Sequence, residues 1–285
     1  MTAAYDRRIT PARPDLAAEH LRGVIAADRY VVGQPMRAEV PVLPMSPEPR
    51  RDVSIDTQAL FGEEIIVYER GDEGWCWGQL TRDGYVGYVS TNALGFDAPA
   101  LTHRVTELQT IIYPGPDMKM PLVGTLPLGA QVQVTELRGD FACVPWQGWI
   151  FAAHLAPLDQ YCEDFVATAE RFLNAPYLWG GKSSNGIDCS GLVQVSLQSA
   201  GHVCPRDTDM QKAALGAPLT VGDDLKGLQR GDLVFWKGHV GVMQDADRLL
   251  HANGHHMLVA SEPLRVARDR ILQKSFGPIT AIKRL

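Results

Sequence analysis

One cysteine and two histidines have the types and spacing needed for covalent chemistry on an amide. Cys189 follows a glycine-rich loop and precedes the apolar run 192–197, which predicts a buried helix ended by Gly201. Cys189 would then lie in the first helical turn, where unpaired N–H groups and the helix dipole favour a thiolate. His239 and His251 follow on segments of alternating apolar residues. A thiol, an imidazole base and a group that orients the base are what a cysteine hydrolase requires.

The two histidines are expected to lie close together on a hairpin. They are separated by twelve residues, an even number that places them on the same face if the alternation continues through the turn. Diagonal partners on neighbouring antiparallel strands lie about 7–8 Å apart at the backbone, within reach of two imidazoles. Asn253 is near His251 in the sequence and is an alternative for the residue that orients the base.

The elements that must position these residues change in character near residue 158. From 26 to 157, short apolar runs broken by Gly, Pro and Asp are typical of an all-β region. A weak internal repeat matches 61–69 with 128–136, and in each copy an aromatic residue and a closing apolar run follow. Each copy has room for several short strands, which indicates a small, partly open barrel. After residue 158, helical spacing precedes alternating runs, which predicts an α+β domain.

We therefore expect a multidomain chain with two small all-β barrels followed by an α+β catalytic domain. Residues 1–25 form a lead-in, in which 15–21 could form a short helix after a proline. The expected domains are 26–97 and 98–158 for the barrels and 159–285 for the catalytic part. Within the catalytic part, helices are expected over 163–173, from Cys189 onward with Asp188 or Ser190 as the N-cap, and over 205–212.

Composition excludes several classes of function. The 285 residues are 45% apolar and 21% charged, as in soluble globular proteins. A net charge of −6 and the absence of a basic stretch with aromatics argue against nucleic-acid binding. Five cysteines without a Cys-x-x-Cys pair predict free thiols, with neither a disulfide framework nor a zinc site. Without an export signal or an apolar run of membrane-spanning length, the expectation is a cytoplasmic protein without metal or cofactor.

Four motifs of the last domain resemble the NlpC/P60 family of papain-like cell-wall peptidases. They occur in the family's order: Pro176-Tyr177-Leu178-Trp179-Gly180-Gly181, Asp188-Cys189-Ser190-Gly191-Leu192-Val193, Gly231-Asp232-Leu233-Val234-Phe235-Trp236 and His239-Val240-Gly241-Val242. The resemblance implies that Cys189 is the nucleophile, His239 the general base and acid, and His251 the third polar residue. It also implies that Tyr177 lies at the active site.

The two all-β repeats resemble bacterial SH3-like (SH3b) domains. Two such domains before an NlpC/P60 domain resemble the γ-D-glutamyl-L-diamino-acid endopeptidases, which cleave L-Ala-γ-D-Glu from the diamino acid, meso-diaminopimelate or Lys, of murein stem peptides with a free N-terminal alanine. The residues that this resemblance assigns to substrate binding are Tyr85, Tyr177, Asp188, Ser190, Arg206, Asp207 and Thr208. Tyr85 lies on a turn where burial is not forced. The barrel's acidic partner for the substrate amine is one of Glu48, Asp52 or Asp56.

The resemblance predicts a cytoplasmic enzyme that recycles released murein peptides, with no obligate protein partner. A free ammonium removed from water must meet acceptors or a carboxylate, so such a site selects short peptides with a free amine. One alternative is an exported autolysin that acts on intact peptidoglycan and is anchored by its SH3b domains. Others are a non-catalytic murein-binding scaffold and a related acyltransferase acting on lipids.

Overall fold

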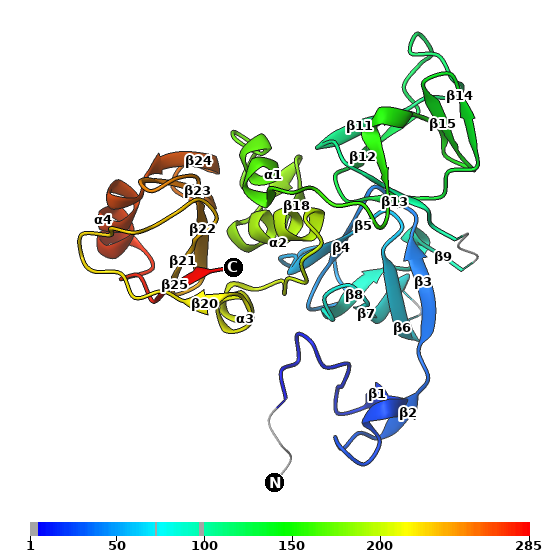
Figure 1. Ribbon diagram of the computed structural model, residues 1–285. Helices are drawn as coiled ribbons and strands as arrows, with labels where there is room; N and C mark the ends of the chain where they lie inside the picture. The colour runs from blue at the N-terminus through cyan, green and yellow to red at the C-terminus, as the bar shows by residue number, and fades with distance from the viewer. Residues whose placement is uncertain (1–4, 72, 97–99) are drawn as a thin grey trace. The chain divides into compact units, whose positions relative to one another are not determined.

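The structure is a computed structural model that describes residues 5–71, 73–96 and 100–285 (Figure 1). The chain divides into two compact units, Met1–Asp159 and Gln160–Leu285. The first unit is all-β apart from single 3₁₀ turns, and the second combines α-helices with a large sheet. None of the described helices is long and apolar enough to cross a membrane. The expected α+β class of the region after residue 158 is therefore correct.

The first barrel of unit one is a five-stranded antiparallel sheet with an added hairpin. The order in the sheet is β8-β7-β6-β3-β9, and β4 pairs with β5. Alternate residues of β6 are buried because successive side chains on a strand point to opposite faces. Ile65 of β6 packs with Met36 and Val89 in the barrel core. The elements are β3 (Gln34–Ala38), β4 (Val42–Met45), β5 (Thr57–Leu60), β6 (Glu64–Arg70), β7 (Trp75–Leu80), β8 (Val86–Ser90), η2 (Thr91–Ala93) and β9 (Leu94–Gly95).

A second set of short strands follows, with a core of its own. Val105, Ile112, Leu126 and Ile150 are buried together. The strands form three small antiparallel sheets, in the orders β13-β10-β17, β11-β12 and β14-β15-β16. Their bounds are β10 (His103–Val105), β11 (Gln109–Ile112), β12 (Gly124–Pro127), β13 (Gln131–Val132), β14 (Glu136–Arg138), β15 (Phe141–Val144), β16 (Gly148–Phe151), η3 (Ala152–His154) and β17 (Leu155–Pro157).

The internal repeat of the sequence corresponds to equivalent elements in the two sets. Trp75 begins β7 as Phe141 begins β15, and both strands are central in an antiparallel trio. Leu94 begins β9 directly after η2, as Leu155 begins β17 directly after η3. The repeat therefore reflects a repeated order of elements, whereas the assignment of the second set to the SH3-like class remains a prediction.

The helix that could form over 15–21 is absent. Leu16–Ala18 forms β1, which pairs in parallel with β2 (Arg29–Val31), and a single 3₁₀ turn, η1 (Glu19–Leu21), follows. Leu16 is fully buried against Trp77 of the first barrel. All three β1 residues are buried, and this packing with the strand pairing outweighs the local helical tendency. The lead-in therefore packs against the first barrel, in a small cluster separate from the barrel core.

Unit two contains a six-stranded antiparallel sheet in the order β20-β25-β21-β22-β23-β24. Helices α1 and α2 pack together and α2 packs on β22 and β23, whereas α4 packs on β23 and β24 (Figure 1). The bounds are α1 (Phe165–Arg171), β18 (Lys182–Ser183), β19 (Gly186–Ile187), α2 (Cys189–Ser199), α3 (Thr208–Ala214), β20 (Ala217–Pro218), β21 (Leu233–Trp236), β22 (His239–Met243), β23 (Arg248–Asn253), β24 (Leu258–Pro263), α4 (Leu264–Lys274) and β25 (Ala281–Arg284). The expected helices over 163–173, from Cys189 and over 205–212 correspond to α1, α2 and α3.

Candidate active site

Cys189 is the first residue of α2, as the sequence predicts. Asp188 is the N-cap and accepts a 2.6 Å hydrogen bond from the Gly191 N–H, which satisfies one of the helix's unpaired donors. Gly191 has no room for a side chain, since a Cβ there would lie 2.2 Å from the Gly181 carbonyl oxygen. The thiol is 7% exposed. The tight cap therefore fixes the position of the sulfur at the helix start.

Asp188 also forms a buried ion pair with Arg206. Two guanidinium nitrogens of Arg206 lie 3.0 and 2.6 Å from the two carboxylate oxygens, and a third contact joins Arg206 to the Ser190 hydroxyl at 2.8 Å. The Gly180 N–H donates to the second oxygen of Asp188 at 2.8 Å. The carboxylate is thus compensated within the chain before any substrate binds. The predicted role of Asp188 and Ser190 in binding a substrate amine would be additional to these structural contacts.

From the sequence, the helix terminus is expected to favour a thiolate at Cys189, but burial outweighs this influence in the free chain. Burial, together with the Asp188 carboxylate, raises the pKa of the thiol to about 11. A hydrogen bond from the Val240 backbone N–H and contacts to Thr208 and Arg206 oppose this shift but are the smaller influences. The Thr208 hydroxyl lies 3.9 Å from the sulfur. Cys189 is therefore a neutral thiol at neutral pH and needs a base to become nucleophilic.

His239 and His251 meet across a strand pair, as the spacing predicts. Strands β22 and β23 pair with Val242 opposite Leu250, so continuing this register makes the two histidines a diagonal pair. Their rings are 5.1 Å apart, and Nε2 of His239 lies 2.8 Å from Nδ1 of His251. Gly241 lies between them, where a Cβ would be 3.1 Å from the Cβ of His251.

The hydrogen bonds continue from His251 to a carboxylate that the sequence analysis missed. His251 Nε2 lies 2.8 Å from Oε1 of Glu262 on β24, and Arg270 of α4 donates to both oxygens of Glu262, at 2.7 and 2.6 Å. Although burial opposes it, the hydrogen bonds from His251 and Arg270 hold the pKa of Glu262 well below its usual range. Glu262 is therefore an ionised acceptor.

This acceptor determines the tautomer of both imidazoles. Because Glu262 can only accept, His251 carries its proton on Nε2 and offers Nδ1 as an acceptor. His239 must then donate from Nε2, which leaves its Nδ1 as a free lone pair. Burial, together with the positive charge of Arg270, lowers the pKa of His239 well below its ordinary value. A neutral imidazole with a lone pair on a defined atom is a suitable general base.

Cys189 is held next to His239 by a hydrogen bond to the backbone of the adjacent residue, and not by a bond to the imidazole itself. The thiol accepts the N–H of Val240, the residue after His239, and no side-chain hydrogen bond joins the cysteine to the histidine within the described residues. The His239 ring is stacked on Phe276, 5.3 Å away and 9° from parallel. Catalytic hydrogen bonds are often long before substrate binds, so this geometry is compatible with proton transfer.

Asn253, the alternative for the third residue, bonds to His256 in the turn after β23 and forms no hydrogen bond with His239 within the described part of the chain. Its side-chain oxygen accepts from the backbone N–H of His256 and lies 2.9 Å from that residue's Nδ1. Its amide nitrogen lies 3.3 Å from the His251 carbonyl oxygen. Asn253 therefore shapes the β23–β24 turn, whereas His251 contacts the base.

The other residues assigned to substrate binding in unit two surround the thiol. Tyr177 is half-buried, and burial, together with the Asp188 carboxylate, raises the pKa of its hydroxyl. Thr208 begins α3, for which Asp207 is the N-cap residue. The structure thus gathers Tyr177, Asp188, Ser190, Arg206 and Thr208 around Cys189, and their roles toward a substrate remain predictions.

Tyr85 and the three acidic residues belong to the first unit. Although the turn that carries Tyr85 does not force burial, Tyr85 is 4% exposed and packs in the barrel core. Glu48 and Asp52 are exposed and both lie near Arg50, at 3.0 and 3.6 Å. Asp56 is half-buried. The assignment of Tyr85 and of one of these carboxylates to a substrate amine stays a prediction.

Comparisons with known proteins define the class of the chain. Residues 45–94 match the family described as the bacterial dipeptidyl-peptidase Sh3 domain, and residues 174–274 match the NlpC/P60 family. The chain is 30% identical over 228 residues to the gamma-D-glutamyl-L-lysine dipeptidyl-peptidase of Bacillus subtilis (strain 168), covering 70% of this chain and 73% of that protein. It is 24% identical over 230 residues to dipeptidyl-peptidase 6 of Lysinibacillus sphaericus, covering 72% and 83%.

A solved structure has the same fold. A crystal structure of an NlpC/P60 family protein from Bacillus cereus superposes with a TM-score of 0.71 at 19% identity, covering 88% of this chain and 99% of that chain. Fold, motifs and relatives together define a peptidase with an N-terminal SH3-like domain. The chain belongs to the NlpC/P60 family of peptidoglycan peptidases.

Proposed function

We propose that this chain is a cysteine endopeptidase that cleaves the bond between γ-D-Glu and the diamino acid of murein stem peptides with a free N-terminal L-Ala. The observation that carries the proposal is the directed hydrogen-bond chain from Glu262 through His251 to His239, beside the buried thiol of Cys189. The name of the Bacillus subtilis relative, gamma-D-glutamyl-L-lysine dipeptidyl-peptidase, supports the bond, and that of the Lysinibacillus sphaericus relative, dipeptidyl-peptidase 6, supports release of a dipeptide.

The first half of the reaction is acylation of Cys189. As the sulfur attacks the γ-carbonyl carbon, its proton passes to Nδ1 of His239, and the C–N bond then breaks as that proton moves to the leaving amine. Backbone N–H groups in the first turn of α2 are suited to hold the oxyanion. His251 accepts the hydrogen bond of the His239 imidazolium that forms, and the Glu262 carboxylate, held by Arg270, accepts in turn from His251, so the two residues stabilise the positive charge.

The second half is hydrolysis of the thioester. A water gives its proton to His239 and attacks the acyl carbon, and the C–S bond breaks with return of the proton to sulfur. The products are L-Ala-D-Glu and a peptide that begins with the diamino acid. The resting thiol is neutral, so acylation needs the imidazole lone pair of His239 to accept its proton. Hydrolysis uses the same lone pair to accept a proton from water.

The site is further proposed to select substrates that have a free N-terminal amine. The polar groups around the thiol, which include the half-buried Tyr177 and the buried Ser190, favour a ligand that brings hydrogen-bonding groups over an apolar one. A requirement for a free N-terminus would restrict the enzyme to released peptides, as in murein recycling in the cytoplasm. Tyr85 and one acidic residue of the first barrel are proposed to take part in this recognition.

The test is hydrolysis of free L-Ala-γ-D-Glu-diaminopimelate beside its N-acetylated form and beside intact sacculi. We expect cleavage of the free peptide alone. Equal cleavage of the acetylated peptide would overturn the free-amine requirement, and release of peptides from sacculi would favour an autolysin. Failure to cleave any of the three would reject the assigned bond.

A further inference from the structure

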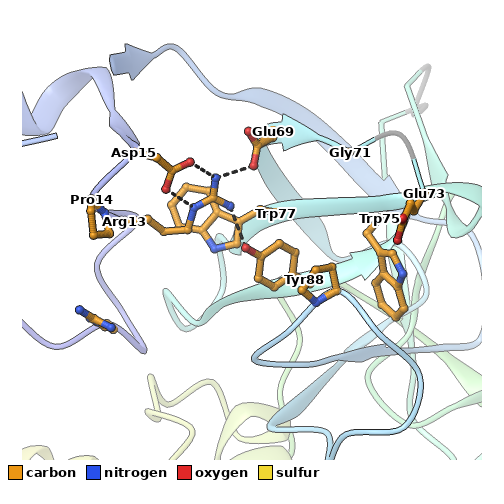
Figure 2. A pocket seen from close by; sticks show the side chains of 11 residues that line it. Arg13, Pro14, Asp15, Glu69, Gly71, Glu73, Trp75, Trp77 and Tyr88 are labelled. Carbon is orange, nitrogen blue, oxygen red and sulfur yellow. Dashed lines mark hydrogen bonds and ion pairs between the residues drawn. The ribbon is translucent and has the colours of Figure 1, made fainter. Parts of the chain in front are cut away.

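The first unit carries a pocket that the proposed reaction does not use. Its volume is about 570 Å³, and it lies where the N-terminal segment meets β6, β7 and β8 of the first barrel (Figure 2). Three aromatic side chains and three carboxylates line it: Trp75, Trp77, Tyr88, Asp15, Glu69 and Glu73. Aromatic faces beside carboxylates are the chemistry that binds organic cations.

One half of the pocket already holds a cation of the chain itself. The guanidinium carbon of Arg13 lies 4.5 Å from the ring centroid of Trp77 and 5.8 Å from that of Tyr88. Arg13 donates to the Tyr88 hydroxyl at 2.8 Å and forms ion pairs with Asp15 and Glu69. Arg13 therefore shows in this protein how the pocket binds a basic side chain.

The other half presents an aromatic ring and a carboxylate, Trp75 and Glu73, that no cation among the described residues contacts. Figure 2 shows Trp75 and Glu73 on the side of the pocket away from Arg13. The Trp75 side chain is half-buried and Glu73 is exposed. Among the described residues, neither Glu73 nor Arg7, which also lines the pocket, has an ion-pair partner. Glu69 differs, because it pairs with both Arg13 and Arg29.

We propose that this open half binds the basic side chain of a short peptide, against the carboxylate of Glu73 and the rings of Trp75 and Tyr88. The unpaired Arg7 provides a cation for the carboxylate of the same peptide. A pocket that offers a carboxylate, a guanidinium and aromatic rings suits a zwitterionic ligand better than a purely anionic or apolar one. The site is separate from Cys189 chemistry and does not rest on the proposed reaction.

The test uses the full-length Cys189→Ala chain, so that no peptide is turned over. The probes are the dipeptide L-lysyl-D-alanine, its C-terminal amide, and L-norleucyl-D-alanine, which keeps the aliphatic chain but lacks the side-chain ammonium. Binding is followed by the indole N–H resonances of the six tryptophans, with the Trp75 signal assigned through Trp75→Phe. Signals of Trp146 and Trp149 in the second set of strands serve as an internal reference.

We expect the lysyl peptide to shift the Trp75 signal saturably, and the norleucyl peptide to bind about tenfold more weakly. Glu73→Gln should weaken the lysyl peptide similarly, and Arg7→Gln should remove the difference between the acid and its amide. Glu39→Gln changes an exposed carboxylate of the same barrel that does not line this pocket, and it should leave binding intact. Equal binding of the two peptides, an unaffected Glu73→Gln, or no Trp75 shift at all would overturn the proposal.

Discussion

Nε2 of His251 lies 2.8 Å from Oε1 of Glu262, and this contact sets the direction of every hydrogen bond in the proposed catalytic chain. Glu262 is held by two hydrogen bonds from Arg270 and can only accept. The proton on His251 is thereby placed on Nε2, and the lone pair of His239 is placed on Nδ1. The tautomer of the base His239 is thus determined by Glu262, which does not contact His239 and acts through His251.

Glu262→Gln should lower kcat roughly 100-fold with little change in KM. An uncharged amide can also donate, so it no longer enforces the tautomer or stabilises the imidazolium. Steady-state kinetics on the free murein tripeptide measure the effect. The matched control is Glu170→Gln, which removes a carboxylate paired with Arg230 and Gln244 on the surface of the same unit. Wild-type kcat in Glu262→Gln would contradict the assigned role.

His251→Ala and Asn253→Ala should separate the two candidates for the third residue. We expect His251→Ala to reduce kcat by roughly 10²-fold or more, because His239 loses its 2.8 Å partner. Asn253→Ala should leave kcat within about threefold, since its side chain bonds the turn that contains His256. Thermal unfolding of both variants shows whether either has lost its fold. The reverse order of kcat values would make Asn253 the orienting residue.

Alkylation of Cys189 in the free enzyme should accelerate with pH up to about 11. Burial and Asp188 raise the pKa of the thiol to about 11, so the protonated form dominates below that value and the reactive thiolate increases as pH rises. Iodoacetamide labelling, read by mass spectrometry on the peptide containing Cys189, separates this thiol from the exposed Cys162. A rate that is flat from about pH 5 to 8 would instead show a preformed thiolate–imidazolium pair.

Arg206→Met should destabilise the chain by about 3–5 kcal/mol, because it leaves the carboxylate of Asp188 buried and uncompensated. Arg230→Met is the matched control: its pairs with Asp164 and Glu170 are solvent-exposed, so we expect a loss of less than about 1 kcal/mol. Urea unfolding followed by tryptophan fluorescence measures both values. Equal losses would mean that the buried pair contributes no more than a surface pair.

The parts of the site that follow from local sequence rules were predictable. The Asp188 cap and the helix start at Cys189 depend on residues next to one another in the chain. The meeting of His239 and His251 depends on strand alternation across a single turn, so counting residues was sufficient.

Glu262, the carboxylate that the sequence analysis missed, could not be found by counting residues along the strands. His251 is paired with Ala260, which makes Glu262 its diagonal neighbour on the next strand, by the same geometry that joins the histidines. That register depends on the turn at 254–257, where Met257 has a left-handed φ of 55° that the sequence did not indicate. Arg270 arrives from α4 and could be placed only by the tertiary fold.

The raised pKa of the Cys189 thiol was not foreseen, for a related reason. The helix terminus is a local feature and favours a thiolate, but burial is a property of the whole domain and has the larger effect here. Tyr85 illustrates the same point, because nothing in the local sequence of its turn requires the burial in the barrel core that the fold imposes.

The central claim is that Cys189 forms a thioester with the L-Ala-γ-D-Glu portion of the substrate. The most direct measurement is acid quenching of the enzyme during turnover of L-Ala-γ-D-Glu-diaminopimelate, followed by mass spectrometry of the intact chain and of the peptide that contains Cys189. The account predicts a dipeptidyl adduct on Cys189, and neither adduct nor turnover in Cys189→Ala. Undiminished turnover by Cys189→Ala, or an adduct on another residue, would contradict it.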